Sequence, residues 1–186
     1  QGAHVGGIGE GLQMPLALFQ YPFSSPATHA TATLAALAEL PWLVGIKEGS
    51  DSMTLYEDNL RAVKAVKPGL MMLPSNFDWF LPQLAVGGDG ILTGLASLAP
   101  EALARLWRAS EARNLDDMRV ANDALYPLVR AVYALPRSDM YARIKQALHD
   151  DGLIGSAFSR TCKTVFGDAE RGALRLATRQ HHDRVE

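Results

Sequence analysis

The chain has 186 residues, of which 48% are hydrophobic and 20% charged, a composition that excludes both a disordered chain and a disulfide-rich miniprotein. Its 18 basic and 20 acidic residues leave a formal net charge of −2, which provides no basic surface for nucleic acid or an anionic membrane. Cys162 is the single cysteine, and no apolar run reaches the roughly 20 residues of a membrane helix. We therefore expect a cytoplasmic protein whose partner is a small molecule or another protein.

The opening stretch QGAHVGGIGEG has neither the basic nor the apolar region of a signal peptide. It begins at Gln1 rather than at a methionine, so we expect the start to be cut. Its glycines have the wrong spacing for a dinucleotide-binding loop, and no predicted strand precedes them. We interpret this stretch as the end of a helix followed by a loop.

Four short apolar runs bounded by helix breakers predict strands that are buried on both faces. These runs are residues 16–19, 42–46, 70–73 and 90–93. The prolines that introduce the first three, Pro15, Pro41 and Pro68, are separated by 26 and 27 residues. One strand, one helix and two loops occupy about that length, so the spacing predicts consecutive βα units with a parallel sheet.

Stretches with helical spacing lie between the predicted strands, and further helices follow the last one. The expected helices cover residues 28–37, 54–66, 77–86, a segment that begins near Pro100, 115–134, 140–149 and 169–176. Thr54 begins a capping-box pattern with Glu57. Pro82 argues against a regular third helix, and Pro127 predicts an interruption of the fifth. The sequence therefore predicts an α/β protein with a helical C-terminal tier.

Lys47, at the end of the second predicted strand, is the candidate catalytic residue. Alternation along the strand divides its side chains between two faces: Leu43, Gly45 and Lys47 on one, and Trp42, Val44 and Ile46 on the other. If helices cover the Trp42 face, Lys47 points into an enclosed interior, where desolvation lowers the pKa of its amine and makes it a nucleophile. The alternative is a strand-end lysine that reaches solvent and pairs with Glu48.

Three stretches, in this order and spacing, resemble the second half of the dihydrodipicolinate synthase/N-acetylneuraminate lyase family: Leu18-Phe19-Gln20-Tyr21-Pro22, Val44-Gly45-Ile46-Lys47-Glu48 and Gly87-Gly88-Asp89-Gly90-Ile91-Leu92-Thr93-Gly94. Residues 141–148 and 152–154 resemble the C-terminal helices of that family, so the resemblance runs from about Met14 through most of the chain. The family consists of class I aldolase-type (β/α)8 TIM barrels. The resemblance implies a partial barrel, roughly strands five to eight, with residues 1–98 as the βα units and 99–186 as the last barrel helix and extra C-terminal helices.

The resemblance also implies a chemistry. Lys47 would form a Schiff base with the keto group of a 2-oxo acid, as in lyases of the aldolase or dehydratase type, with no metal and no organic cofactor. The site is expected at the carboxyl ends of the strands, where the sites of barrel enzymes assemble. The residues expected to line the site are Phe19, Tyr21, Ser24, Ser25, Ser75, Asn76 and Thr93. A homo-oligomer is the expected assembly.

The chain departs from the family pattern at two site positions. Phe19 stands where members that act on pyruvate usually carry a tyrosine that relays protons. Tyr21 lies on the same strand face, but about 6.6 Å further along. Ser24 or Ser25 replaces the arginine that commonly binds the substrate carboxylate. These departures disfavour a plain dihydrodipicolinate synthase.

The length is the third departure, because a whole barrel takes about 250 residues and the match begins near the fifth strand. Half a barrel exposes two sheet edges and its inward apolar face. The chain is then either a fragment of a longer protein or one of two halves that associate. Two functions remain open: the Schiff-base lyase, which a fragment could fail to perform, and a non-catalytic family remnant that serves as a binding or assembly module. A self-contained flavodoxin-like sheet is disfavoured because no phosphate loop is present.

Overall fold

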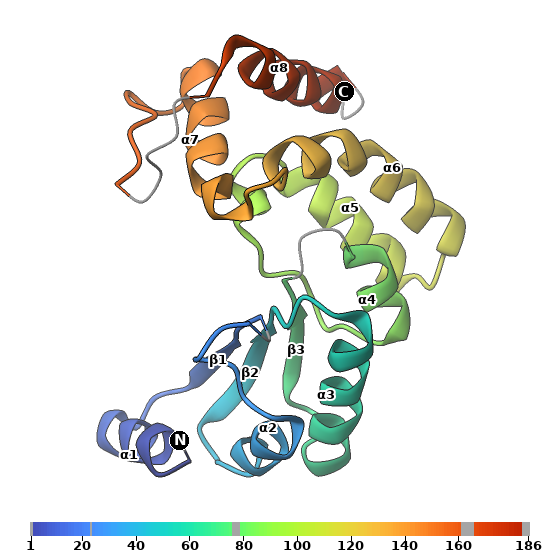
Figure 1. Ribbon diagram of the computed structural model, residues 1–186. Coiled ribbons are helices and arrows are strands. Elements are labelled where there is room, and N and C mark those ends of the chain that lie inside the picture. Colours follow the sequence, from blue (N-terminus) through green and yellow to red (C-terminus); the bar gives the residue numbers. More distant parts are fainter. Residues whose placement is uncertain (1, 23, 76–78, 161–165, 184–186) are drawn as a thin grey trace. The chain divides into compact units, whose positions relative to one another are not determined.

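The computed structural model describes residues 2–22, 24–75, 79–160 and 166–183 (Figure 1). The chain divides into two compact units, Gln1–Leu92 and Thr93–Glu186. In the described part of the chain, no helix is long and apolar enough to cross a membrane.

The first unit contains a three-stranded parallel sheet in the order β1-β2-β3. Its strands are β1 (Leu16–Gln20), β2 (Leu43–Glu48) and β3 (Met71–Pro74), and its helices are α1 (Gly2–Leu12), α2 (Thr31–Ala38), α3 (Met53–Val66) and α4 (Phe80–Val86). Strands and helices alternate along the chain, so the first three predicted strands and the βα order are confirmed. The predicted loop in the opening stretch is wrong in part, because α1 includes all of its glycines.

The core of this unit lies between the sheet and its helices. Its buried members come from α2, the strands and α3: Leu34, Leu37, Ala38, Leu43, Ile46, Tyr56, Leu60, Val63, Leu70 and Met72. These side chains are at most 5% exposed, so the sheet has one thoroughly buried face. Burial of this apolar surface stabilises the unit by about 25 cal/mol for each Å² removed from water.

The predicted alternation of side chains along β2 is wrong at its first residues. Leu43 and Ile46 both belong to the core, although simple alternation would place them on opposite faces. The pairing register explains this result: Leu16 pairs with Leu43, but Ala17 pairs with Gly45, so Val44 is an extra residue in β2. Such a bulge shifts the alternation by one residue. From Gly45 onward the prediction agrees with the structure in setting Lys47 apart from Ile46.

The predicted fourth strand, residues 90–93, is not a strand of the sheet. The segment follows the edge of β3 through two hydrogen bonds, from the Asp89 N–H to the Met72 carbonyl (2.8 Å) and from the Leu92 N–H to the Pro74 carbonyl (2.9 Å). Gly90, between them, has a φ of +151°, which interrupts regular strand geometry. Residues 90–93 thus lie along the edge of β3, where the fourth strand was predicted, but they do not form a complete ladder of strand hydrogen bonds.

Two helix signals also have a different outcome in the structure. Ser52, rather than Thr54, caps α3, because its hydroxyl accepts a hydrogen bond from the Leu55 N–H at 3.3 Å. Pro82 lies in the first turn of α4, where a missing N–H costs no helical hydrogen bond. The predicted third helix is therefore present, although it begins at Phe80.

The second unit is helical, as predicted. Its helices are α5 (Pro100–Glu111), α6 (Leu115–Val132), α7 (Met140–Asp150) and α8 (Asp168–Asp183), with 3-10 turns at Gly94–Ser97 and Arg137–Asp139. Pro127 lies inside α6 without ending it, so the predicted interruption is wrong. Arg143 of α7 is 2% exposed and donates hydrogen bonds to the carbonyls of residues 132 and 134–136. It also pairs with Glu170 of α8 at 2.8 Å, so one guanidinium joins three elements.

Candidate active site

The candidate site is a row of side chains across the sheet near the carboxyl ends of its strands. Phe19 of β1 pairs in register with Lys47 of β2, and Lys47 pairs with Leu73 of β3. Register partners in neighbouring strands project from the same face of a sheet. Because Ile46 and Glu48 on either side of Lys47 are fully buried on the core side, the row lies on the other face.

Lys47 is half-buried, and burial lowers the pKa of its amine. Its Nζ lies over the ring of Phe19, 4.1 Å from the ring centroid. In the described part of the chain no carboxylate lies within ion-pairing distance of this nitrogen. Burial therefore lowers the pKa of the amine without an opposing effect from a described carboxylate, which would favour the charged form.

Glu48 does not pair with Lys47, so the alternative of a solvent-facing pair between them is wrong. The Glu48 side chain is fully buried, and its Oε1 accepts a hydrogen bond from Asn59 Nδ2 at 3.0 Å. Its Oε2 accepts one from the Ser50 N–H at 3.4 Å. Burial raises the pKa of Glu48 more than these hydrogen bonds lower it. Adjacent strand positions face opposite ways, and this separates the carboxyl from the amine.

Two aromatic rings, one from β1 and one from the residue after it, pack against each other, and the Phe19 ring contacts the Lys47 nitrogen. The centroids of Phe19 and Tyr21 are 4.1 Å apart, with the ring planes inclined by 34°. A Cβ on Gly49 would lie 3.0 Å from the Phe19 ring, so a glycine at this position allows the ring to sit there. The predicted site residues Phe19, Tyr21 and Lys47 are thus brought together. Phe19 carries no hydroxyl, and among the described residues no hydrogen bond joins Tyr21 to Lys47.

The face that carries Lys47 is apolar and open. Val44, Met71 and Tyr21 are 37%, 43% and 41% exposed, respectively. Gly45 lies against Met71, since a Cβ there would be 3.6 Å from the Met71 Cε. The structure thus agrees with the expectation of an uncovered inward face. A face of this kind is an interaction surface or a liability in a free chain.

The predicted serines lie in loops at the same end of the sheet. Ser24 is exposed, and Ser25 Oγ accepts a hydrogen bond from the Ala27 N–H at 3.2 Å, as in a local turn. Ser75 follows β3, is 7% exposed, and its N–H donates to the Glu48 carbonyl at 3.0 Å. Ser75 therefore extends the β2-β3 pairing by one residue. Asn76 lies outside the described residues.

Thr93 belongs to the second unit, where it has a structural partner. Its Oγ1 accepts a hydrogen bond from the Leu95 N–H at 3.3 Å and caps the 3-10 turn. The same oxygen lies 3.0 Å from the Tyr133 hydroxyl. These contacts account for Thr93 as a capping residue, and its role in substrate binding stays a prediction.

Sequence analysis missed a buried polar network behind Lys47. Besides Glu48, it contains Asn59 of α3, which is fully buried and whose Oδ1 accepts a hydrogen bond from the Thr31 hydroxyl at 2.7 Å. The signal was available, because Asn59 lies between core residues of α3 at helical spacing, where an unpaired amide would be costly. The network ties the end of β2 to α2 and α3.

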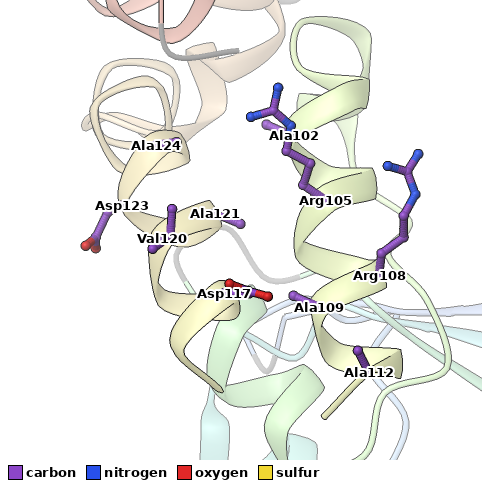
Figure 2. A pocket seen from close by; sticks show the side chains of 10 residues that line it. All are labelled: Ala102, Arg105, Arg108, Ala109, Ala112, Asp117, Val120, Ala121, Asp123 and Ala124. Carbon is purple, nitrogen blue, oxygen red and sulfur yellow. The ribbon is translucent and has the colours of Figure 1, made fainter. Parts of the chain in front are cut away.

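No group of three or more metal-ligating side chains occurs among the described residues. A pocket of about 700 Å³ lies in the second unit between α5 and α6 (Figure 2). Alanines form much of its lining, and Arg105 and Arg108 project from α5 on one side of it. None of the predicted site residues lines this pocket.

Parallel βα units with a half-buried lysine at the carboxyl end of the middle strand define an α/β protein whose candidate site lies where barrel enzymes assemble theirs. The sequence model of the Dihydrodipicolinate synthetase family matches residues 3–178, and the chain belongs to this family.

The 4-hydroxy-tetrahydrodipicolinate synthase of Thiobacillus denitrificans is 32% identical over 125 residues, which are 67% of this chain and 41% of that protein. The crystal structure of the dihydrodipicolinate synthase from Thermotoga maritima has a TM-score of 0.87 at 22% identity, covering 97% of this chain and 60% of the other. The Acinetobacter baumannii enzyme, solved as a complex with pyruvate, has a TM-score of 0.83 at 22% identity, covering 97% of this chain and 60% of that one. The chain spans 41–57% of the length of the curated relatives compared.

Proposed function

We propose that this chain carries the lysine of a Schiff-base-forming lyase, of the aldolase or dehydratase type, that acts on a 2-oxo acid. The observation that supports this function best is the position of Lys47, half-buried on an apolar sheet face with a pKa lowered by burial. A strand end holds the amine in place, and the absence of a described carboxylate partner favours its neutral form. The pyruvate bound to the Acinetobacter baumannii relative is a 2-oxo acid of the proposed class.

The proposed reaction begins with attack of the neutral Lys47 amine on the keto carbon. A carbon–nitrogen bond forms, the nitrogen loses its protons, and the keto oxygen takes up two protons and leaves as water. The resulting imine, once protonated, withdraws electrons from the adjacent carbon. In the aldolase type, the carbon–carbon bond from that carbon then breaks, and its electron pair is delocalised into the imine as an enamine. In the dehydratase type, that carbon instead loses a proton to give the enamine, which expels a hydroxyl group from the next carbon as water. Protonation of the enamine and hydrolysis of the imine return the amine.

We further propose that the chain corresponds to the second half of a (β/α)8 barrel, about strands five to eight. The hydrogen bonds from Asp89 and Leu92 to β3 support this view, since they place residues 90–93 at the edge where a following strand would pair. Additional strands, from a longer polypeptide or a second copy, would cover the exposed Val44 and Met71. The greater length of the relatives supports a longer polypeptide as the source of these strands. A second copy would instead supply them in a homo-oligomer.

The competing function is a non-catalytic family member that binds or assembles. It is favoured by Phe19, which offers no hydroxyl beside the amine, and by the serines in place of a carboxylate-binding arginine. Borohydride reduction of the folded chain in the presence of pyruvate separates the two functions. The lyase predicts a stable adduct on the peptide that contains Lys47 and none on the peptide that contains Lys64.

The control is Lys47→Met, which removes the amine and should abolish the adduct while the circular dichroism spectrum stays unchanged. A panel of larger 2-oxo acids tests the substrate class. If the folded chain forms no adduct with any of them, the catalytic proposal is wrong for this chain and the binding or assembly function takes its place.

A further inference from the structure

The ring of Phe19 makes a cation–π contact with the Lys47 amine. The nitrogen lies 4.1 Å from the ring centroid, within the roughly 6 Å over which an aromatic face attracts a cation. The two residues are also register partners in adjacent strands, so the backbone pairing sets this contact. Strand pairing fixes the backbone positions of both residues, so this contact is better defined than a contact between side chains on two flexible segments.

The Phe19 ring is itself held on two further sides. Tyr21 packs against it at 4.1 Å between centroids, and Gly49 approaches it closely from the loop after β2. A side chain at position 49 would push against the ring, because its Cβ would lie 3.0 Å from the Phe19 ring edge. The ring therefore has little freedom to leave the amine.

Few titratable groups face the amine from the elements around it. On the β1 side Tyr21 packs against the Phe19 ring, on β2 Glu48 points to the opposite face, and β3 (Met71–Pro74) carries no titratable side chain. Residues 76–78 lie outside the described chain. The negative face of the Phe19 ring, 4.1 Å from the nitrogen, is thus a described contact that stabilises a positive charge at Lys47.

We propose that Phe19 is the electrostatic and positioning partner of Lys47, holding its nitrogen in place through the positively charged states of the reaction. This inference rests on the proposed Schiff-base function for its role in catalysis. The protonated imine keeps the positive charge on the same nitrogen as the ammonium, so one ring can stabilise both. An aromatic face would then occupy the position at which a hydroxyl was expected from the family pattern, and Tyr21 would support the ring rather than relay protons.

The test is a fluorination series at position 19, because fluorine weakens the negative face of the ring with little change in its size. The chain with phenylalanine, 4-fluorophenylalanine or 3,4,5-trifluorophenylalanine at this position is labelled with trace acetic anhydride across a range of pH. Mass spectrometry of the peptides then reports the acidity of each lysine. We expect the acid dissociation constant of Lys47 to rise stepwise, by about two- to five-fold in total.

Two controls keep the result specific. The acid dissociation constant of Lys64, a lysine of α3 that pairs with Asp89 at 2.7 Å, should not change across the series. Tyr21→Phe keeps the stacked ring and removes only the hydroxyl, so it should leave the acidity of Lys47 unchanged. An unchanged Lys47 in the trifluorinated chain, or a Tyr21→Phe effect as large as fluorination, would overturn the inference. The labelling uses no 2-oxo acid, so its outcome is independent of whether the chain forms an imine.

Discussion

Replacing Glu48 by glutamine tests whether a buried carboxyl behind Lys47 makes the stability of the first unit depend on pH. Burial raises the pKa of Glu48 in the folded chain above its value in the unfolded chain, about 4.3. The stability contributed by this carboxyl is fully present below the unfolded-state pKa and is lost as pH rises through the raised folded-state value. We therefore expect the wild-type chain to lose stability above about pH 4.3 and Glu48→Gln to lose less.

The contacts of Glu48 set the size of the mutational effects. Glutamine keeps a carbonyl oxygen for Asn59 Nδ2 but cannot accept with its amide nitrogen from the Ser50 N–H, so it loses one hydrogen bond, worth about 1 kcal/mol. Alanine leaves both buried donors without an acceptor. At about 1–3 kcal/mol for each, Glu48→Ala should cost about 2–6 kcal/mol.

Urea unfolding followed by circular dichroism at several pH values between 4 and 8 measures these effects. Glu57→Gln is the matched control, because Glu57 lies on the exposed surface of α3 and pairs there with Arg61. Its substitution should change stability by about 0.5 kcal/mol or less. The reasoning fails if wild type and Glu48→Gln show the same dependence of the unfolding midpoint on pH.

Three further predictions concern stabilising contacts within each of the two units. Arg143→Ala should lower the free energy of unfolding by about 3–5 kcal/mol, measured by urea titration, because it removes a buried guanidinium that satisfies four carbonyls and Glu170; Arg143→Lys should restore only part of this loss. Ser52→Ala should lower the thermal midpoint through the loss of the α3 cap, about 1 kcal/mol, whereas Thr54→Ala should change it less. Gly88→Ala should destabilise by about 1–3 kcal/mol, because its Cβ would lie 2.7 Å from the Pro74 ring; Gly69→Ala, with no atom within 4 Å, is the control in the same denaturation assay.

The sequence predicted the first three βα units because their signals are local. Each strand is a short apolar run after a proline, and the repeat of 26 and 27 residues leaves room for one helix in each connection. The strand position of Lys47 left its role open between a buried nucleophile and a solvent-facing lysine, and the resemblance of the Val44-Gly45-Ile46-Lys47-Glu48 stretch to the family made it the candidate catalytic residue.

Local sequence patterns could not predict how the strands pair. The bulge at Val44 moves Leu43 into the core, and it is visible only in the register with β1. The segment 90–93 is apolar enough for a strand, yet Gly90 and the spacing of its two hydrogen bonds to β3 decide otherwise. The choice of Ser52 over Thr54 as a cap likewise depends on where the chain enters α3.

The sequence by itself thus determined the first three βα units, the family and Lys47 as the candidate residue, because apolar periodicity and short motifs are properties of neighbouring residues. Only the tertiary structure decided what surrounds that lysine. The Phe19 ring over its nitrogen and the separation of Glu48 onto the opposite face both arise from strand pairing and burial, which bring together residues far apart in the chain.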